Sequence, residues 1–282
     1  MLCRNPYVRK ENGIITVLDP ETRGHAAPFG CGQCLPCRIN KQRELRAKII
    51  LESKTHPKSS FYTMTFSDEN LPRDKAIKTE TMQKFVKRLR KHIYPDKVRY
   101  FIVGEYGEKN GRPHYHAMLF GLGMEDKPRI DKAWKLGMTQ IGDINSKTAH
   151  YVTDYTLKGR LLDESSVAHT VKIQSTKPAL GMDFINKIAD QIVASGMVPP
   201  SVDYFQMGKH KYYLGRHLRE AITERLGNGD RSKLQQFIHV SEQMRNHDVL
   251  SPSYRANCVL ENESKAELQT KRNHIHRKRR PL

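Results

Sequence analysis

The spacing of apolar and polar residues predicts alternating helices and strands from about residue 40 onward. A helix is expected from Asn40 to Lys54, because Leu45, Ile49 and Ile50 lie one turn apart on the same side of it. The run SFYTMTF that follows is aromatic and β-branched and ends at the turn-forming SDENLP. It therefore predicts a strand.

The next segment, KTETMQKFVKRLRKHI, predicts an amphipathic helix, because its apolar residues recur at helical spacing and most of its basic residues fall outside that stripe. The stripe consists of Met82, Phe85, Val86, Leu89 and Ile93. Two β-like runs follow, VRYFIVGEYG and PHYHAMLFG. The polar, glycine-containing EKNGR between them predicts an antiparallel hairpin.

After Trp134 the pattern predicts one more strand and one more helix. The strand is MTQIGDI, and the helix KTAHYVTDYTLKGR has Asn145 or Ser146 as its N-terminal cap and Gly159 as its stop. The order strand, helix, hairpin, strand, helix implies an antiparallel sheet with helices packed on it. The predicted class is therefore α+β.

The flanking parts of the chain carry weaker patterns. The turn-prone DPETRGHAAPFGCG predicts an irregular N-terminal segment, whereas GMDFINKIADQIVASG and YYLGRHLREAITERLG predict helices. The final KRNHIHRKRRPL is too charged to pack and is expected to form a basic arm. We expect an N-terminal segment with cysteines and a helix (1–57), a central domain (58–225), and a helical extension with a basic tail (226–282).

The charge of the chain points to a polyanionic partner. Its 49 Lys and Arg against 30 Asp and Glu give a formal net charge of +19, which favours phosphate contacts and hence nucleic acid. No run approaches the roughly 18 apolar residues of a membrane helix, and the start MLCRNPYVRKENG lacks the apolar core of a signal peptide. We therefore expect a cytoplasmic protein with no membrane partner.

Two histidines on the second strand of the predicted hairpin are candidate metal ligands. His114 and His116 point to the same face of a strand, and Glu105 on the neighbouring strand could add a carboxylate. Two imidazoles and one carboxylate suit a divalent ion that also holds a substrate oxygen. The alternative is a pair of half-exposed strand residues, since a second His-x-His occurs in the tail at His274 and His276.

Two tyrosines on the last predicted helix of the central domain are candidate nucleophiles. Tyr151 and Tyr155 are four residues apart and Lys158 follows three residues later, so all three share one helix face. A phenol oxygen can attack a phosphodiester to form a phosphotyrosine, provided that a cation or metal helps to ionise it and neutralises the phosphate. The alternative is an aromatic stripe that packs on the sheet.

The cysteines and the basic helix face add two further candidate sites. Cys3, Cys31, Cys34 and Cys37 could bind a structural Zn²⁺ as four thiolates, or they could be reduced cysteines in a turn. The basic residues of the second helix could contact DNA phosphates, or they could form a solvated face. These DNA-binding candidates are Lys84, Lys87, Arg88 and Lys91.

Three motifs in order, FYTMTFSDENLP, YFIVGEYGEKNGRPHYHAMLFG and YVTDYTLKG, resemble the rolling-circle motifs of HUH endonucleases. The chain resembles in particular the replication initiators of small single-stranded DNA phages, the gokushovirus type of microvirus. CGQCLPCR and KYYLGRHLRE also resemble blocks of that group, so the resemblance spans most of residues 1–220. It implies that residues 58–225 form an HUH endonuclease domain with a ferredoxin-like, RRM-like fold.

The resemblance further implies a metal-dependent nickase that cuts one strand of a phage origin. His114 and His116 match its metal ligands, and Mg²⁺ or Mn²⁺ is the usual metal. Glu105 is the expected third ligand, but Tyr106 and Glu108 lie close to it, and a slip of one residue in the register would turn a different side chain to the metal face. Tyr151 and Tyr155 match its paired nucleophiles, which keep the 5′ phosphate and leave a 3′ hydroxyl for the host DNA polymerase. Because the chain has no GxxxxGK[ST] phosphate loop, a host helicase is expected as a partner.

Two other functions stay open on the sequence alone. One is a noncatalytic, zinc-containing nucleic-acid-binding regulator, in which the histidine strand and the tyrosine stripe belong to the core. The other is a transposase or relaxase with the same chemistry. Cleavage of a single-stranded origin would separate the initiator from the first of these alternatives. The resemblance implies that the initiator acts in the cytoplasm of the bacterial host.

Overall fold

A computed structural model of the 282-residue chain describes residues 3, 6–9, 15–17, 29–107, 111–158, 171–195, 204–208 and 210–227. The chain divides into two compact units. One contains residues 1–43 and 231–282, and the other contains residues 44–230. The predicted basic tail and the predicted helix stop at Gly159 lie outside the described residues.

The unit of residues 44–230 is built on a five-stranded antiparallel sheet in the order β6-β3-β5-β4-β7. Alternation of buried and half-buried residues along the third strand of the chain reflects one side chain on each face in turn. The strands are β3 (Ser59–Thr65), β4 (Arg99–Tyr106), β5 (Pro113–Phe120), β6 (Thr139–Asp143) and β7 (Lys172–Gln174).

Four of these strands and two helices follow the ferredoxin-like topology. The chain order is β3, α2 (Thr79–Ile93), β4, β5, α3 (Lys127–Trp134) and β6, and the sheet order β6-β3-β5-β4 is that of a split βαβ pair. A short 3-10 turn, η1 (Met124–Asp126), leads into α3. The predicted α+β class and the predicted hairpin are both confirmed.

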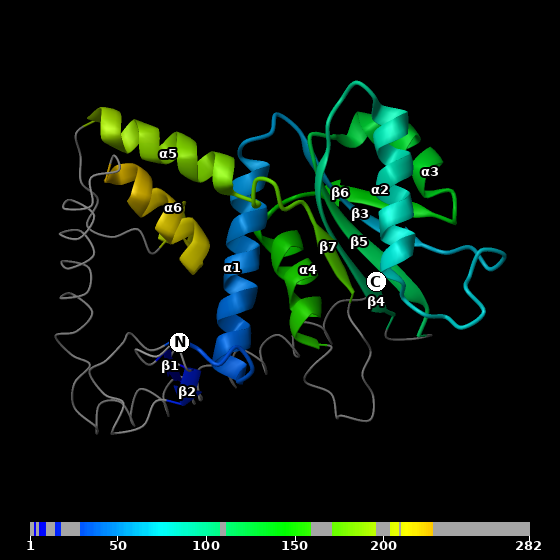
Figure 1. Ribbon diagram of the computed structural model, residues 1–282. Coiled ribbons are helices and arrows are strands. Elements are labelled where there is room, and N and C mark those ends of the chain that lie inside the picture. Colours follow the sequence, from blue (N-terminus) through cyan, green and yellow to red (C-terminus); the bar gives the residue numbers. More distant parts are fainter. Residues whose placement is uncertain are drawn as a thin grey trace. The chain divides into compact units, whose positions relative to one another are not determined.

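One face of the sheet is covered by α2 and α3 (Figure 1). The entire predicted apolar stripe of α2 is buried there, together with Tyr62, Tyr115 and Trp134. The indole N–H of Trp134 donates to the carbonyl of Thr65 at 3.0 Å, so its polar atom is satisfied inside the core. This face forms an apolar core.

The other face is covered by α1 (Leu35–Ser53) and α4 (Ser146–Lys158), as Figure 1 shows. Leu45, Ile49 and Ile50 of α1 pack in one cluster with Phe101 and Phe120 of the sheet, as the helical spacing predicts. The cap of α4 is Asn145, whose side-chain oxygen accepts hydrogen bonds from the backbone N–H groups of residues 147 and 148. The candidate tyrosines are carried by this helix.

The remaining described elements lie outside the central sheet. Helices α5 (Met182–Ser195) and α6 (Arg216–Leu226) pack against each other around Ile185, Leu218 and Ile222. Two small hairpins are formed by β1 (Tyr7–Arg9) with β2 (Ile15–Val17), and by β8 (Tyr204–Met207) with β9 (His210–Tyr213). Within the described residues, no helix combines the length and apolar character needed to cross a membrane.

Two predicted boundaries and one predicted irregular segment are wrong. Helix α1 begins at Leu35 rather than Asn40, because Pro36 is tolerated in a first turn, where its missing N–H has no partner to lose. Tyr212 and Tyr213 belong to β9 instead of the last helix, since Tyr213 pairs with Tyr204. The N-terminal segment, predicted to be irregular, contains the paired strands β1 and β2.

A buried carboxylate joins α1 to the sheet and to a distant loop. Glu52 is fully buried, and it accepts hydrogen bonds from Arg99 of β4, from His56 and from the backbone N–H of Gly181 at 2.7 Å. Arg99 also donates to the carbonyl of Pro178 at 2.7 Å. Burial alone would raise the pKa of Glu52, but its three donors outweigh this effect and lower the pKa.

We expect Glu52→Gln to destabilise the protein by about 3 kcal/mol, because it removes the charge that compensates a largely buried guanidinium. Thermal or urea unfolding measures the change. The difference from the parent protein should be full above the usual glutamate pKa of about 4.3 and should shrink as the pH falls through the lowered pKa of Glu52. Glu125→Gln is the matched control, since Glu125 is an exposed carboxylate paired with Lys58. Equal effects of the two substitutions would contradict the proposed role of Glu52.

Candidate active site

Side chains of the central strand β5 alternate between the two faces of the sheet, which have different surroundings. Tyr115 lies in the core beneath α2 and donates to the carbonyl of Lys78 at 3.3 Å. Burial raises the pKa of Tyr115, which keeps its phenol neutral. His114 and His116 project to the opposite face, on which α1 and α4 pack. The prediction that Tyr115 faces the core is confirmed.

His116 is held by polar partners from both neighbouring strands. Its Nε2 lies 2.7 Å from Oε1 of Glu105 on β4, and its Nδ1 lies 3.0 Å from Oγ1 of Thr63 on β3. The imidazole is only 2% exposed, so these contacts satisfy both nitrogens in a place that water scarcely reaches. Glu105 and His116 are therefore brought together as the sequence predicts.

His114 has a different set of contacts. Directly opposite Glu105 in the strand register, it donates from Nδ1 to the carbonyl of Arg112 at 2.7 Å, which leaves the lone pair on Nε2. Arg112 is itself anchored to the carbonyl of Phe66 at 2.9 Å. Among the described residues, only four cysteines bring three or more ligand atoms within 4.8 Å of one another. A metal held by His114, His116 and Glu105 together thus requires at least one of these side chains to move.

Aromatic rings surround His116. Tyr155 stacks on the imidazole with ring centroids 5.3 Å apart and an interplanar angle of 7°, and Tyr151 meets it edge-on at 5.2 Å. Phe61 of β3 also stacks on His116 at 5.7 Å. The two tyrosine rings are themselves in edge contact at 5.0 Å. The i, i+4 spacing on α4 therefore places both phenols beside the Glu105–His116 pair.

Helix α4 is also tied to α1 through polar groups. Arg46 of α1 lies 3.2 Å from Nδ1 of His150, and Nε2 of His150 lies 3.6 Å from a carboxylate oxygen of Asp154. Asp154, which stands between the two tyrosines in sequence, is buried, so a polar neighbour such as the His150 imidazole lowers the cost of burying its carboxylate. Lys158 ends α4, but the position of its side chain is outside the described part of the structure.

The chemistry of the donor set fits a divalent cation. Carboxylate and imidazole ligands both bind Mn²⁺, and an ion with open positions can accept a phosphate oxygen as well. The second contacts of the histidines also fit, because a metal-binding histidine commonly directs its other nitrogen to a backbone carbonyl or a polar side chain. For His114 this partner is the Arg112 carbonyl, and for His116 it is the Thr63 hydroxyl.

Sequence reasoning missed several residues of this face. Phe61 and Thr63 belong to it because β3 pairs directly with β5, which aligns Thr63 with His116. Lys172 is exposed and aligns with Val103 across the β4–β7 ladder, so its side chain emerges on the same face of the sheet. The alternation of SFYTMTF could have placed Phe61 and Thr63 on one face. No local signal identified β7.

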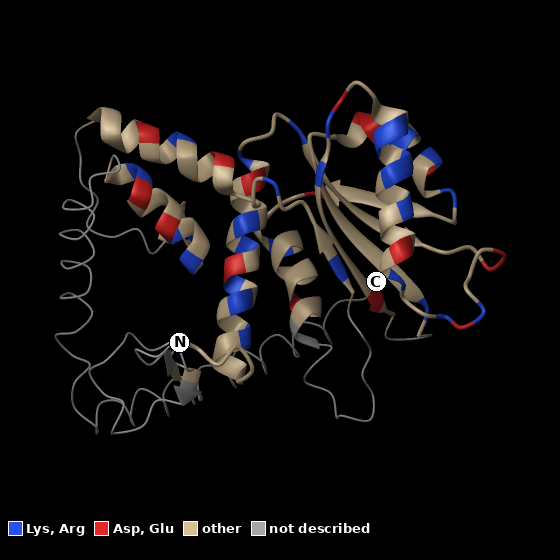
Figure 2. Ribbon diagram, in the orientation of Figure 1, with Lys and Arg blue, Asp and Glu red and all other residues tan. Residues whose placement is uncertain are grey.

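The predicted DNA-binding residues of α2 lie on the other side of the sheet. Lys84, Lys87 and Lys91 are exposed along the outer surface of α2, which covers the face of Tyr115 (Figure 2). Arg88 differs from them, because its Nε donates to the carbonyl of Ala133 at 2.7 Å at the end of α3. The α2 lysines are thus separated from the histidine–tyrosine cluster by the sheet itself.

The structure also brings Cys3, Cys31, Cys34 and Cys37 together, in the unit that contains residues 1–43. All four are thiols without disulfide bonds. The backbone N–H of Cys34 lowers the pKa of the Cys31 thiol to about 6, whereas burial raises the pKa of Cys37.

Known proteins share the part of the chain that contains the candidate site. Residues 59–160 match a family model described as the replication-associated protein ORF2. This span runs from the first residue of β3 to just beyond α4 and includes both histidines and both tyrosines.

Three curated relatives come from small phages. The replication-associated protein VP4 of Bdellovibrio phage phiMH2K is 28% identical over 60% of this chain and 61% of its own length. ORF4 of Chlamydia phage 1 is 23% identical over 70% of this chain and 55% of its own, and ORF2 of Spiroplasma virus 4 is 31% identical over 45% and 47%. Both are replication-associated proteins. The matched part of the chain thus spans about half to three fifths of the length of these relatives.

A solved structure of the N-terminal nuclease domain of the minute virus of mice non-structural protein 1 matches 54% of this chain and 83% of that domain. Its identity is 12% and its TM-score 0.21, which is too little for an argument about fold or chemistry. The similarity to replication-associated proteins therefore rests on the phage relatives and the family model. The chain is therefore similar to the replication-associated proteins of these phages, and residues 59–160 are the part that matches the ORF2 family model, so the resemblance that its motifs indicate is confirmed.

Proposed function

We propose that this protein initiates rolling-circle replication by nicking and rejoining single-stranded DNA at a phage origin. The observation that carries the proposal is the packing of Tyr151 and Tyr155 against His116, whose imidazole contacts Glu105. The potential nucleophiles therefore lie beside potential metal ligands on the same face of the sheet. The family relationship of residues 59–160 to phage replication-associated proteins supports the same function.

The reaction that suits these groups is attack of a tyrosine oxygen on a phosphodiester. The phenol gives up its proton, the new bond joins its oxygen to phosphorus, and the bond from phosphorus to the 3′ oxygen breaks. The departing 3′ oxygen takes up a proton, and the 5′ phosphate stays on the tyrosine. Attack by a 3′ hydroxyl on the phosphotyrosine reverses these steps and rejoins the strand without another energy source.

The side chains around the tyrosines have separate roles in this proposal. A Mg²⁺ or Mn²⁺ ion held by His114, His116 and Glu105 would polarise the scissile phosphate. Thr63 and the Arg112 carbonyl orient the two imidazoles. Lys158 and the exposed Lys172 are the lysines proposed to lower the negative charge near the phosphate.

The two tyrosines permit two successive cleavages. While one holds the first 5′ end, the other can cut the regenerated origin, so that a completed circle is released. The 3′ hydroxyl from the first cut would prime the host DNA polymerase, and a host helicase would separate the strands. This scheme places the protein in the cytoplasm of the bacterial host.

We expect Tyr151 to make the first cut, because Tyr155 is 6% exposed beneath its stack with His116 whereas Tyr151 is only partly buried. Tyr151→Phe should slow formation of the first covalent adduct at least about a thousandfold, as removal of a nucleophile does. Tyr155→Phe should leave the first adduct within about tenfold of the parent rate. A labelled single-stranded origin oligonucleotide with Mn²⁺, followed by denaturing electrophoresis, measures both rates.

Tyr94→Phe is the matched control for these variants, since Tyr94 is an exposed tyrosine at the end of α2. It should form adduct at the parent rate. If the parent protein forms no adduct with any origin-derived strand, or if the Tyr151→Phe, Tyr155→Phe double variant still forms one, the proposed chemistry is wrong.

Glu105→Gln and the double change His114→Ala, His116→Ala should each lower metal-dependent cleavage at least about a hundredfold, because they remove proposed ligands. Binding of the single strand, measured by fluorescence anisotropy, should remain within about threefold. The matched control changes the tail pair, His274→Ala and His276→Ala, which has the same spacing. If the strand-histidine variant still cleaves DNA while the tail variant does not, His114 and His116 are not the metal ligands.

The α2 lysines are proposed to bind DNA phosphates without contributing to the chemical step. Changing Lys84, Lys87 and Lys91 to Ala should lower the salt dependence of single-strand binding by about 2 in the log–log slope, or about 0.7 for each lost phosphate contact. The rate of cleavage at saturating DNA should stay unchanged, since the sheet separates α2 from the tyrosines. An unchanged slope would identify a solvated helix face instead.

A further inference from the structure

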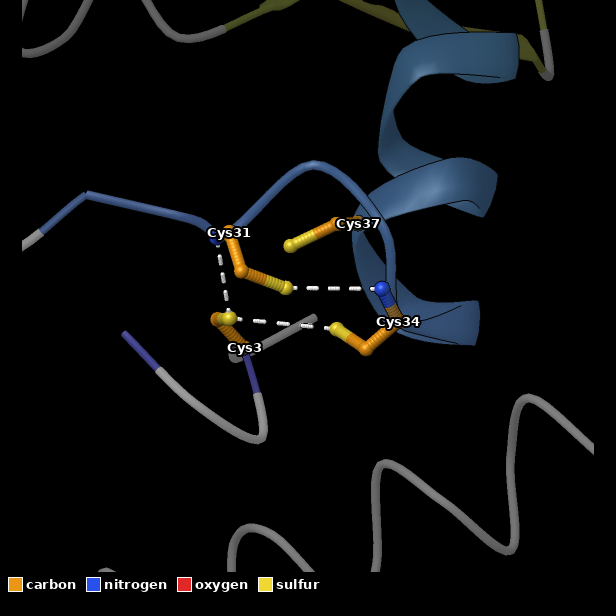
Figure 3. Close-up of side chains that lie close together, drawn as sticks. All are labelled: Cys3, Cys31, Cys34 and Cys37. Carbon is orange, nitrogen blue, oxygen red and sulfur yellow. Dashed lines mark hydrogen bonds between the residues drawn. The ribbon is translucent and has the colours of Figure 1, made fainter. Parts of the chain in front are cut away.

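We infer that Cys3, Cys31, Cys34 and Cys37 bind one structural Zn²⁺ as four thiolates, at a site separate from the proposed catalytic metal. Their four sulfur atoms all lie within 4.8 Å of one another. Figure 3 shows the side chains converging from three places: the N-terminal segment, the turn before α1, and the first turn of α1. Four convergent cysteine sulfurs are the usual donor set of a structural zinc site.

The separation of the sulfurs suits a tetrahedral ion. Sγ of Cys3 and Sγ of Cys34 are 3.8 Å apart. In a regular tetrahedron with Zn–S bonds of about 2.3 Å, two sulfurs lie about 3.8 Å apart. A disulfide would require about 2.05 Å. The spacing therefore matches shared ligation of one ion and excludes a covalent bond between these two cysteines.

Backbone N–H groups point at the sulfurs and would partly balance the negative charge of four thiolates around one dication. The N–H of Cys31 donates to Sγ of Cys3 at 3.2 Å, and the N–H of Cys34 donates to Sγ of Cys31 at 3.4 Å (Figure 3). Gly32 enables this turn, because its φ of +75° is a conformation that side chains other than glycine rarely adopt. The turn is thus shaped to direct amides toward sulfur.

Space for the fourth sulfur depends on another glycine. A Cβ atom on Gly30 would lie 2.7 Å from Sγ of Cys37, which is closer than real Cβ contacts allow. Only a residue without a side chain leaves Cys37 in place at this position. The two glycines that flank Cys31 therefore have separate roles in assembling the cluster.

Backbone pairing, in addition to contacts between sulfur atoms, holds the segment of Cys3 near the other three cysteines. Tyr7 and Phe29 form an isolated antiparallel bridge with two backbone hydrogen bonds of 2.9 and 2.8 Å, and their rings stack at 6.2 Å. This bridge brings the chain near Cys3 back to the turn at Cys31. A bound ion would close the same loop of the chain, which reduces the entropy of its unfolded form.

Metal analysis of the full-length protein, purified in reducing buffer without chelator, tests this inference. We expect about one zinc per chain, as in other four-cysteine sites. Replacement of zinc by Co²⁺ should produce strong thiolate-to-cobalt charge-transfer absorption and the visible bands of a tetrahedral ion. Absence of zinc, an equimolar amount of iron, or disulfide bonds between these cysteines would overturn the assignment.

Variants separate this site from other thiols and from the proposed catalytic metal. Cys34→Ser should lose the zinc, and Gly30→Ala should weaken its retention while keeping all four thiols. Cys258→Ser is the matched control, because it removes a cysteine other than the four proposed ligands and should retain zinc. His114→Ala, His116→Ala should also retain zinc and the cobalt spectrum. Loss of zinc in that last variant would show that the ion belongs to the histidine site and would refute the cysteine assignment, whatever the outcome of the cleavage assays.

Discussion

Every feature of the candidate active site depends on the burial of β5 on both of its faces. Side chains of a strand alternate between faces, and helices cover each face of this sheet. A shift of one residue in the register would move Tyr115 to the proposed site and would bury His114 and His116 in an apolar core. The cost of burying imidazoles there without partners sets the register strongly.

The same register supplies the partners of His116. Because β5 lies between β3 and β4, Thr63 aligns with His116 on one side, while Glu105 aligns with His114 on the other and reaches across to His116. The stacked rings of Phe61 and Tyr155 then exclude most water from the imidazole. A low local dielectric strengthens each of these polar contacts, and it would do the same for contacts to a bound phosphate.

The two faces of the sheet have different physical tasks. On the α2 side, a continuous apolar core stabilises the sheet, and Lys84, Lys87 and Lys91 lie on the outer surface of the helix. On the α1 and α4 side, the apolar cluster includes Tyr155 and packs against Tyr151, and both rings contact the buried His116 of the candidate site. Glu52 and Arg99 join α1 to β4 on this second side, so the helix that covers the site is fixed by an ion pair as well as by packing. The cysteine cluster lies in the unit that contains residues 1–43.

Local periodicity determined much of this arrangement from the sequence alone. The period of two in PHYHAMLFG placed both histidines on one face and Tyr115 on the other, and the i, i+4 spacing placed Tyr151 and Tyr155 together. The buried stripe of α2 and the pairing of Glu105 with His114 follow from the same short-range geometry.

Only the tertiary structure decided which distant segments meet at the site. It placed Thr63 beside His116, added β7 with Lys172 to the sheet edge, directed His114 to the Arg112 carbonyl, and engaged Arg88 at the end of α3. These contacts arise from pairing between residues far apart in the chain, whereas hydrophobic periodicity reports only whether a side chain is buried. The sequence therefore determined which residues share a face, and folding determined which atoms they contact.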